Sequence, residues 1–315
     1  MFNTLIDTHC DTAYELYCRN ENIKTNTCHI SIDKASIYNR YAQFFAIWSD
    51  KRKGNSDTYK DFLKISHNFK EEIATSSDHI SLCTNFADMN KAWDNNKIAA
   101  FLAVEDARLL DGDIKRLDVL YSEGVRYLTL MWGGNTCIGA SHDATGGLTD
   151  FGKDVVERCF DLGIIPDISH SNAQTTSDVI EIAYKRNKPI MASHSNCYSL
   201  YPHTRNLRDE HLKAIIELGG IVGISLCPYH LTDTKKESCN LSHIADHIEK
   251  YLELGGIDSL GFGCDLDGTS LPYGFSGVND IITVADELIK RGISDNTIEK
   301  IMYKNYYDFI QRNLC

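Results

Sequence analysis

The chain has 315 residues, of which 43% are hydrophobic and 24% are charged, a composition typical of a soluble protein with a large core. Its 32 Lys and Arg against 44 Asp and Glu give a net charge of −12, which argues against a nucleic-acid partner because phosphate binding requires basic surfaces. No run of about 18 uncharged apolar residues occurs, so we expect no membrane-spanning helix.

The 11 cysteines are odd in number and scattered along the chain. No Cys-x-x-Cys pair exists, which argues against a zinc ribbon. The first seven residues lack the basic region and apolar core of a signal peptide. We therefore expect reduced thiols in a cytoplasmic protein.

Near-continuous apolar runs, which are typical of buried parallel strands, alternate with segments that carry apolar residues at helical spacing. In chain order the predicted elements are strands 5–11 and 41–48, helix 59–75, strand 98–105, helix 110–123, strand 125–132, helix 150–162, strand 163–170, helix 173–186, strand 188–194, helix 209–218, strand 220–226, helix 241–254, strand 259–265 and two C-terminal helices, 278–291 and 295–313.

This alternation predicts an α/β fold, a (β/α)₈ TIM-type barrel with extra C-terminal helices. Glycines just past several helices, among them Gly163 and Gly255, support the predicted helix ends. The alternative is a doubly wound open sheet, but the Gly-x-Gly-x-x-Gly loop that would favour it does not follow the first strand. No repeat or linker divides the chain, so we expect a single domain over residues 1–315.

Several predicted strands end in side chains that bind metals. Because strand side chains alternate between faces, His9 and Asp11 point the same way and Cys10 points oppositely. The carboxyl ends of parallel barrel strands all reach one rim. Five ligand-type residues can therefore converge there: His9, Asp11, Glu105, His170 and His194.

Imidazole and carboxylate ligands without a thiolate suit a catalytic zinc or a similar divalent ion. Five protein ligands are too many for one open catalytic ion. They suit two ions about 3.5–4 Å apart that share a bridging carboxylate and a water or hydroxide. Any one of these residues could be an ordinary hydrogen-bonded group, but chance does not readily place all five at the same rim.

Two further side chains indicate hydrolysis next to a carboxylate. Asp265 closes the eighth predicted strand, where it can take a proton from an attacking water and pass it to a leaving amine. The alternative, an Asp-Gly turn, explains Asp267 and Gly268 better than Asp265. Arg205 follows the sixth strand and suits bidentate binding of a substrate carboxylate, although a solvated arginine is the simpler explanation of the residue alone.

The chain resembles the renal (membrane) dipeptidase family of zinc metallopeptidases, which have amidohydrolase-like barrels. The matching segments occur in family order and span residues 5 to about 310 of this chain, and together they are highly specific. They are DTHCDT (7–12), Glu105, GGLTDFG (146–152), DISHS (167–171), ASHSN (192–196), HTRNL (203–207) and GCDLDG (263–268).

The resemblance implies two zinc ions per chain. By it, His9 and Asp11 bind one ion, His170 and His194 bind the other, and Glu105 bridges the two. A metal-bridged hydroxide would hydrolyse the peptide bond of free dipeptides, and the family's homodimer is a further expectation.

The same resemblance makes Asp265 the general acid/base and Arg205 the group that holds the substrate's C-terminal carboxylate. Trp132 and Asn206 complete the expected substrate-binding set. Mammalian members carry a histidine where Trp132 stands, and an indole can donate a hydrogen bond but carries no charge. His142, a little further on, could take over that role, although a solvated loop is the simpler explanation of this residue.

Three departures and alternatives stay open at this point. Glu105 is followed by Asp106, where the family usually has a small residue, so the pocket could be narrower or more acidic. A hydrolase of another small amide with a free carboxylate, such as an N-acyl amino acid or a β-lactam, would use the same residues. A catalytically silent binding barrel is the third reading, which the complete ligand set disfavours.

Overall fold

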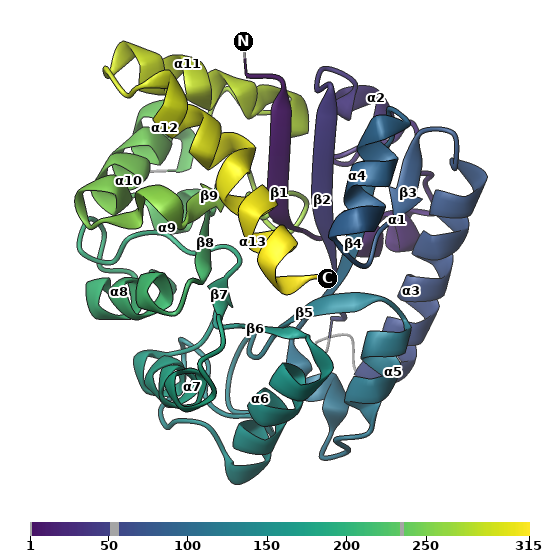
Figure 1. Ribbon diagram of the computed structural model, residues 1–315, viewed down its shortest axis with the longest axis vertical. Coiled ribbons are helices and arrows are strands. Elements are labelled where there is room, and N and C mark those ends of the chain that lie inside the picture. Colours follow the sequence, from purple (N-terminus) through teal and green to yellow (C-terminus); the bar gives the residue numbers. More distant parts are fainter. Residues whose placement is uncertain (1, 51–56, 234–235) are drawn as a thin grey trace.

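A barrel of eight parallel strands forms the centre of the computed structural model, which describes residues 2–50, 57–233 and 236–315 (Figure 1). Each strand pairs in parallel with its neighbours, and the pairings β2–β4 and β1–β9 close the ring. The barrel strands are β1 (Thr4–Cys10), β2 (Arg40–Ile47), β4 (Ile98–Glu105), β5 (Val125–Thr129), β6 (Ile165–Asp167), β7 (Met191–Ala192), β8 (Ile221–Ile224) and β9 (Leu260–Phe262). The predicted fold is confirmed.

The strands of the second half are shorter than the sequence predicts. The strand β7 holds two residues, and the predicted ligands His170, His194 and Asp265 lie two or three residues beyond the strands that precede them. His170 (φ 68°) and Asp265 (φ 60°) adopt left-handed backbone, which is uncommon for residues other than glycine. These side chains therefore stand on turns that follow the strands and not on the strands themselves.

Helices surround the barrel and mostly match the prediction. The described helices are α1 (Thr12–Arg19), α2 (Ile32–Ala35), α3 (Thr58–Thr75), α4 (Phe86–Asp94), α5 (Arg116–Ser122), α6 (Asp150–Leu162), α7 (Ala173–Arg186), α8 (Asp209–Glu217), α9 (Pro228–Leu231), α10 (Leu241–Glu253), α11 (Ile282–Lys290), α12 (Asp295–Glu299) and α13 (Asn305–Asn313). A π-helical turn, Lys300–Lys304, joins the last two.

The differences from the prediction have local causes. The expected helix 110–123 is shortened to α5, which begins at Arg116. A 3₁₀ turn (Ala107–Leu110) precedes it, and Asp111 and Gly112 adopt left-handed backbone that separates the two. A ninth strand, β3 (Ile80–Leu82), extends the sheet beside β4. It was not predicted, and neither were α1, α2, α4 and α9, which are short or mostly polar segments.

The C-terminal helix α13 closes the amino-terminal end of the barrel. Its side chains Phe309 and Ile310 belong to one apolar cluster with Ile165, Met191 and Ile221, which stand at the starts of three strands. Figure 1 shows α13 beside β1 and β9. With this end of the barrel interior filled by side chains, a ligand is expected to enter the barrel from its carboxyl-terminal rim.

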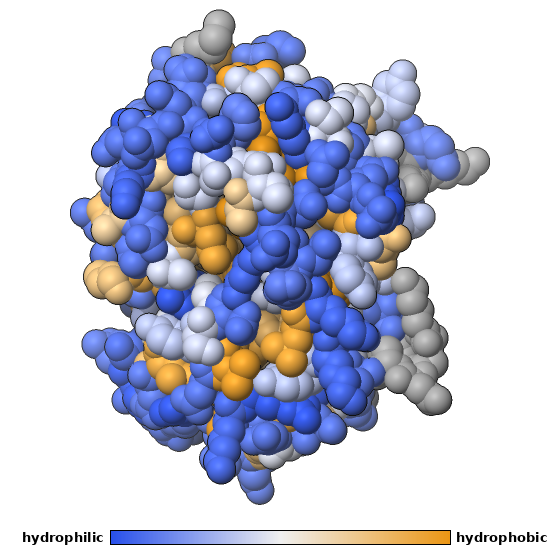
Figure 2. Space-filling model, turned by 90° about the vertical axis from the view of Figure 1, so that its right-hand side faces the viewer, coloured by the Kyte–Doolittle hydropathy of each residue, from blue (hydrophilic) through white to orange (hydrophobic). Residues whose placement is uncertain are grey.

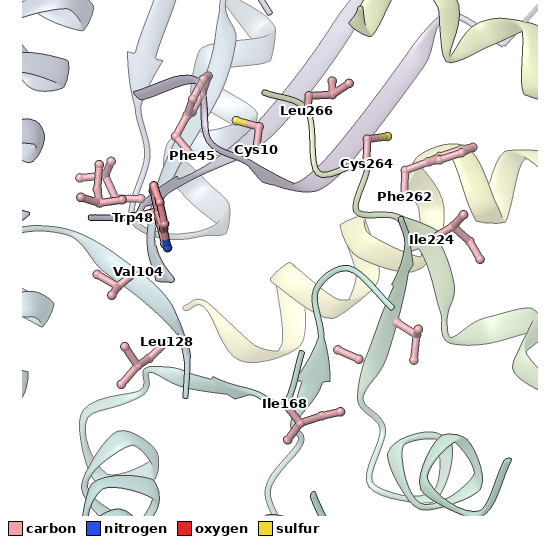
Figure 3. Packing of buried hydrophobic residues seen from close by; sticks show 14 of the residues in the cluster. Cys10, Phe45, Trp48, Val104, Leu128, Ile168, Ile224, Phe262, Cys264 and Leu266 are labelled. Carbon is pink, nitrogen blue, oxygen red and sulfur yellow. The ribbon is translucent and has the colours of Figure 1, made fainter. Parts of the chain in front are cut away.

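A second apolar layer lies between the strands and the outer helices. Cys10, Phe45 and Leu128 point outward from the strands into this layer, as Figure 3 shows. The Sγ of Cys10 contacts the carbonyl oxygen of the neighbouring-strand residue Phe44, so the Cys10 side chain points out of the barrel and not toward the expected ligands, as strand parity predicts. On the face shown in Figure 2, hydrophobic residues reach the surface only in separate areas among hydrophilic ones.

Candidate metal centre

The structure brings all five predicted ligands together at the carboxyl end of the barrel. The Nε2 atom of His9 lies 3.8 Å from Asp11 Oδ2 and 3.7 Å from Glu105 Oε2. On the other side, His170 Nε2 lies 2.8 Å from Glu105 Oε1 and 3.0 Å from His194 Nε2. Residues separated by up to 185 positions therefore form one compact cluster.

Two overlapping groups in this cluster have metal-binding geometry. His9, Glu105 and His194 form one, and His9, Asp11 and Asp265 form the other, with ligand atoms within 4.8 Å of one another. His9 belongs to both groups but offers one nitrogen, whereas Glu105 offers two oxygens. Its Oε2 faces His9 and its Oε1 faces His170 and His194, so Glu105 is the residue that can serve two ions at once.

Hydrogen bonds orient two of the histidines from behind. The Nδ1 of His9 lies 2.8 Å from the Tyr127 hydroxyl, which donates to the carbonyl oxygen of Thr8 at 2.8 Å. Because the hydroxyl proton is used on Thr8, the His9 Nδ1–H is the donor to Tyr127. The Nδ1–H of His170 similarly donates to the Trp132 carbonyl oxygen at 2.9 Å. Each ring therefore presents the lone pair of its Nε2 to the cluster.

The third histidine is held in the same way. His194 Nδ1 lies 2.7 Å from the Ser193 hydroxyl, which donates to Asp167 Oδ2 at 2.5 Å. The Nε2 lone pairs of His170 and His194 thus face each other at 3.0 Å. Two lone pairs at this distance repel, and a cation that both coordinate removes the repulsion.

The charge of the cluster also favours cations. His9 Nε2 and Asp11 Oδ1 are buried and have no hydrogen-bond partner among the described residues. Burial alone would lower the pKa of His9, but the charges of Glu105 and Asp11 outweigh it and raise the pKa to about 10, so these carboxylates draw a cation to His9 Nε2, a proton where no metal ion takes that place. Burial raises the pKa of Asp265 to about 7, with Glu105 adding to the rise and His9 opposing it. Buried oxygen and nitrogen ligands with excess negative charge fit divalent metal ions.

A glycine allows the last turn to approach the cluster. A Cβ atom on Gly268 would stand 2.0 Å from Asp11 Oδ2 and 2.3 Å from Asp265 Oδ1, so any other residue there would displace both carboxylates from the cluster. Asp267 instead accepts hydrogen bonds from the Thr12 hydroxyl and the His29 backbone N–H, both at 2.6 Å. Asp267 therefore fixes the turn, while Asp265 reaches the cluster.

A cavity of about 490 Å³, called the metal cavity below, opens over these ligands. Trp132 and Arg205 line it, and the Trp132 ring lies 5.1 Å from that of Trp48. Arg205 is buried, with 5% of its surface exposed, and its Nε has no hydrogen-bond partner among the described residues. A buried guanidinium of this kind calls for an anionic group on the ligand.

Asn206, expected in the substrate-binding set, does not line the metal cavity within the described ranges. Its amide donates to the carbonyl oxygens of Tyr201 and His230, each at 2.8 Å, and so ties two rim loops together. His142 lies at the rim with its ring 5.9 Å from that of His170. Burial, with the nearby Arg205 charge, lowers its pKa to about 3, so His142 is neutral.

The acidic departure at position 106 is neutralised within the protein. The Asp106 carboxylate pairs with Arg108, which also donates to the Gly133 carbonyl oxygen at 2.6 Å. Neither Asp106 nor Arg108 is among the described residues that line the metal cavity. Asp106 thus supports the loop that carries Trp132 and does not narrow the cavity.

Sequence reasoning gave no role to the groups behind the histidines, namely Tyr127, Ser193 and Asp167. One signal for them was present. Tyr127 and Thr129 are two residues apart on β5, so strand parity places their side chains on the same face. Thr129 donates to Asp167 at 2.5 Å, which shows that this face points into the barrel. Polar side chains at inward positions next to ligand-bearing strands indicate a supporting hydrogen-bond network.

Comparison with known families decides what kind of protein this is. The model of the membrane dipeptidase family, peptidase family M19, matches residues 3–312. The chain belongs to this family. It is therefore a hydrolase of the M19 metallo-dipeptidase family, and the resemblance carried by the short motifs is confirmed. No helix in the described ranges is long and apolar enough to cross a membrane.

Relatives and solved structures agree with this family. A Klebsiella pneumoniae protein, "Uncharacterized protein in pqqA 5'region", is 30% identical over 75% of this chain and 90% of its own length. "Dipeptidase tcpJ" of Claviceps purpurea is 26% identical over 88% of this chain and 67% of its own.

Two crystal structures share the fold of this M19 chain. The metallopeptidase called dipeptidase AC superposes with a TM-score of 0.92 at 22% identity, over 100% of this chain and 99% of its own. A Rhodobacter sphaeroides metallopeptidase bound to a phosphinate mimic of the dipeptide L-Ala-D-Ala gives 0.91 at 21% identity, over 99% and 100%.

Proposed function

We propose that this M19 protein is a zinc-dependent dipeptidase that hydrolyses free dipeptides. The observation that carries the proposal is the position of Glu105, whose two carboxylate oxygens face His9 on one side and His170 with His194 on the other. A single carboxylate between two sets of ligands is the arrangement of a two-metal hydrolase.

In this proposal His9 and Asp11 hold one ion, His170 and His194 hold the second, and Glu105 is shared. Bound zinc would polarise the peptide carbonyl and make a water acidic enough to act as the nucleophile near neutral pH. The hydrogen bonds on each Nδ1 keep the three imidazoles in the tautomer that ligation needs.

Asp265 is the proposed general acid/base. Its Oδ1 lies 3.9 Å from His9 Nε2, at the edge of the ligand cluster and on the wall of the metal cavity. Burial raises the pKa of its carboxyl group toward neutrality. A group in that range can accept the proton of the attacking water and release it to the amine that leaves.

Arg205 is the proposed anchor for the substrate's C-terminal carboxylate. A ligand without that carboxylate would leave the guanidinium buried and unpaired, so amidated substrates should be rejected. Trp132 forms an apolar wall of the same cavity. Asn206 acts as a positioning residue in this scheme, because it joins the loops that carry Arg205 and His230. The dipeptide mimic bound by the Rhodobacter sphaeroides neighbour supports this substrate class.

The direct test is a substrate panel run on protein of measured metal content. We expect about two zinc ions per chain, cleavage of L-Ala-L-Ala and L-Ala-D-Ala, and no cleavage of L-Ala-L-Ala amide. Treatment with a chelator should abolish turnover and added zinc should restore it. Undiminished activity in metal-free protein would contradict the proposal.

Two further measurements separate the alternatives. Faster turnover of N-acetylalanine or of a β-lactam than of any dipeptide would replace the peptidase by another amide hydrolase. We also keep the homodimer as a proposal from the family resemblance, and light scattering of the zinc-loaded protein tests it. A mass of one chain, 35.5 kDa, would contradict the dimer.

A further inference from the structure

A second cavity lies beside the metal cavity and is called the side cavity below. It measures about 360 Å³ and is lined by residues of the rim loops and by the first residues of α7, among them Ser171, Ala173 and Thr204. Arg205 lines both cavities. Arg205 therefore stands between the two cavities, and a carboxylate that it binds would lie next to the side cavity.

The two cavities differ in charge. Six carboxylate residues line the metal cavity: Asp11, Glu15, Asp50, Glu105, Asp265 and Asp267. Their number exceeds the four positive charges of two divalent ions. None of the described residues that line the side cavity is Asp or Glu, and two of them, Arg205 and Arg208, are cationic. A dipeptide would therefore lie with its amino group toward the metal cavity and its anionic end toward the side cavity.

The walls of the side cavity also carry buried polar atoms without partners. Ser171 Oγ, Arg205 Nε and Asn206 Oδ1 make no hydrogen bond among the described residues. Arg205 Nε can only donate and Ser171 Oγ can donate, so these two match an acceptor such as a carboxylate oxygen. Unpaired buried groups of this kind are costly unless a ligand or water completes them.

Arg208 stands at the mouth of the side cavity. Its guanidinium lies 5.2 Å from the centre of the Tyr198 ring, which lines the same cavity. Its contact with Glu210 is long, at 3.8 Å, and the two side chains are 47% and 66% exposed, so this pairing is weak and leaves the Arg208 guanidinium able to interact with a ligand.

We propose that the side cavity receives the side chain of the substrate's C-terminal residue and selects dipeptides in which that residue is acidic, Asp or Glu. The inference rests on the proposed dipeptidase function and specifies its substrate class. Arg205 would bind the α-carboxylate, and the second carboxylate would lie in the side cavity within the field of Arg205 and Arg208.

The test that needs no variant compares nearly isosteric substrates. The zinc-loaded enzyme is assayed with Ala-Glu, Ala-Gln, Ala-Lys and Ala-Ala. Charge-assisted hydrogen bonds exceed neutral ones, so kcat/KM for Ala-Glu should exceed that for Ala-Gln by roughly five- to tenfold, with Ala-Lys the slowest. Equal or faster cleavage of Ala-Gln overturns the inference. If none of the four is cleaved, the proposed dipeptidase function itself fails, which is a different result.

Filling the cavity tests where the side chain lies. Ala173 is the first residue of α7 and lines the side cavity, so Ala173→Phe should lower the kcat/KM ratio of Ala-Glu to Ala-Ala at least tenfold. The matched control is Lys185→Phe on the same helix, whose side chain is 66% exposed and far from this wall. The control should leave the ratio as in the wild type. An unchanged ratio in folded Ala173→Phe protein overturns the placement.

Removing one charge tests the selection itself. Arg208→Gln should reduce the preference for Ala-Glu over Ala-Gln roughly threefold or more. The α-carboxylate is common to both substrates, so only the charged Glu side chain changes the ratio when the cation is lost. Lys213→Gln removes an equal charge from an exposed position on α8 that does not line the cavity and serves as the control. An equal loss of preference in both variants would indicate a general field effect and not a specific site.

Discussion

The two ends of the barrel differ in how far they satisfy their own polar groups. At the amino-terminal end, Phe309 and Ile310 of α13 pack with Ile165, Met191 and Ile221 in an apolar cluster, so few polar groups there need partners. At the carboxyl-terminal rim, His9 Nε2, Asp11 Oδ1 and Arg205 Nε are buried without partners among the described residues. Apolar side chains close one end, whereas the other holds several buried polar atoms that a ligand or metal ion can complete. The cluster of such atoms around His9, Asp11 and Arg205 thus marks the rim as the functional end.

The largest effect should follow from removing the shared carboxylate at the rim. Glu105→Gln keeps the shape but loses the charge and one ligand oxygen, so zinc content should fall and kcat/KM for dipeptides should drop by more than about 10⁴-fold. Zinc analysis and steady-state kinetics measure both. Glu181→Gln on the exposed face of α7 is the control for the chemical change. Full activity with two bound zinc ions would break the proposed two-metal arrangement.

Asp265→Asn should have a smaller effect of a different kind. If Asp265 transfers protons, kcat should fall by roughly 10²–10⁴-fold while zinc content stays near that of the wild type. The acid limb of the pH–rate profile, which the Asp265 carboxyl should produce as it gains a proton, should also disappear. Loss of zinc to the same degree as in Glu105→Gln would instead make Asp265 a ligand, as one of the two geometric groups allows.

At the opposite end a core substitution should alter stability and leave catalysis alone. Phe309 is 3% exposed and fills the apolar cluster under the barrel, so Phe309→Ala should lower the free energy of unfolding by about 3–5 kcal/mol. The zinc-loaded variant should keep kcat/KM within about twofold below its unfolding temperature. Urea unfolding and kinetics on one preparation test this. A large fall in kcat in folded protein would show that the two ends are coupled.

Most of the fold and the ligand set could be predicted from the sequence because both depend on local patterns. Apolar runs and helical periodicity fixed the order of the barrel elements. Alternation along β1 puts His9 and Asp11 on the same face. Because parallel strands share one rim, the ligands that follow different strands meet there. Parity also predicted that Cys10 faces away, which its contact with the Phe44 carbonyl confirms.

The remaining features depend on tertiary contacts that no local pattern encodes. His170 and Asp265 reach the rim through left-handed turns; Asp and His adopt this backbone more often than other non-glycine residues, but it is still uncommon and no local pattern shows where it occurs. Tyr127 acquires its role only when β5 stands opposite β1 across the barrel. The position of Arg205 between two cavities likewise needs the packing of the rim loops.

A fully partnered histidine outside the ligand cluster gives the comparison its smallest expected effect. His247 on α10 is buried, accepts from the Cys197 backbone N–H at 3.0 Å through Nδ1, and lies 2.9 Å from the Leu231 carbonyl oxygen through Nε2. Both nitrogens are used only if Nε2 carries the proton and Nδ1 does not. The neutral ring therefore fits its site, and a second proton would break the bond to Cys197.

Burial lowers the pKa of His247 to about 4, below the value of 6.5 in an unfolded chain. The unfolded state thus binds the proton first, so this contribution to stability is complete above pH 6.5 and is lost as pH falls toward 4. The loss should reach about 2 kcal/mol at pH 5. His247→Gln removes the titration, so the difference in unfolding free energy between wild type and variant should shrink by that amount between pH 7.5 and pH 5. A difference that stays constant over this range would mean that the folded protein accommodates the charged ring, and the contrast with the rim histidines would then disappear.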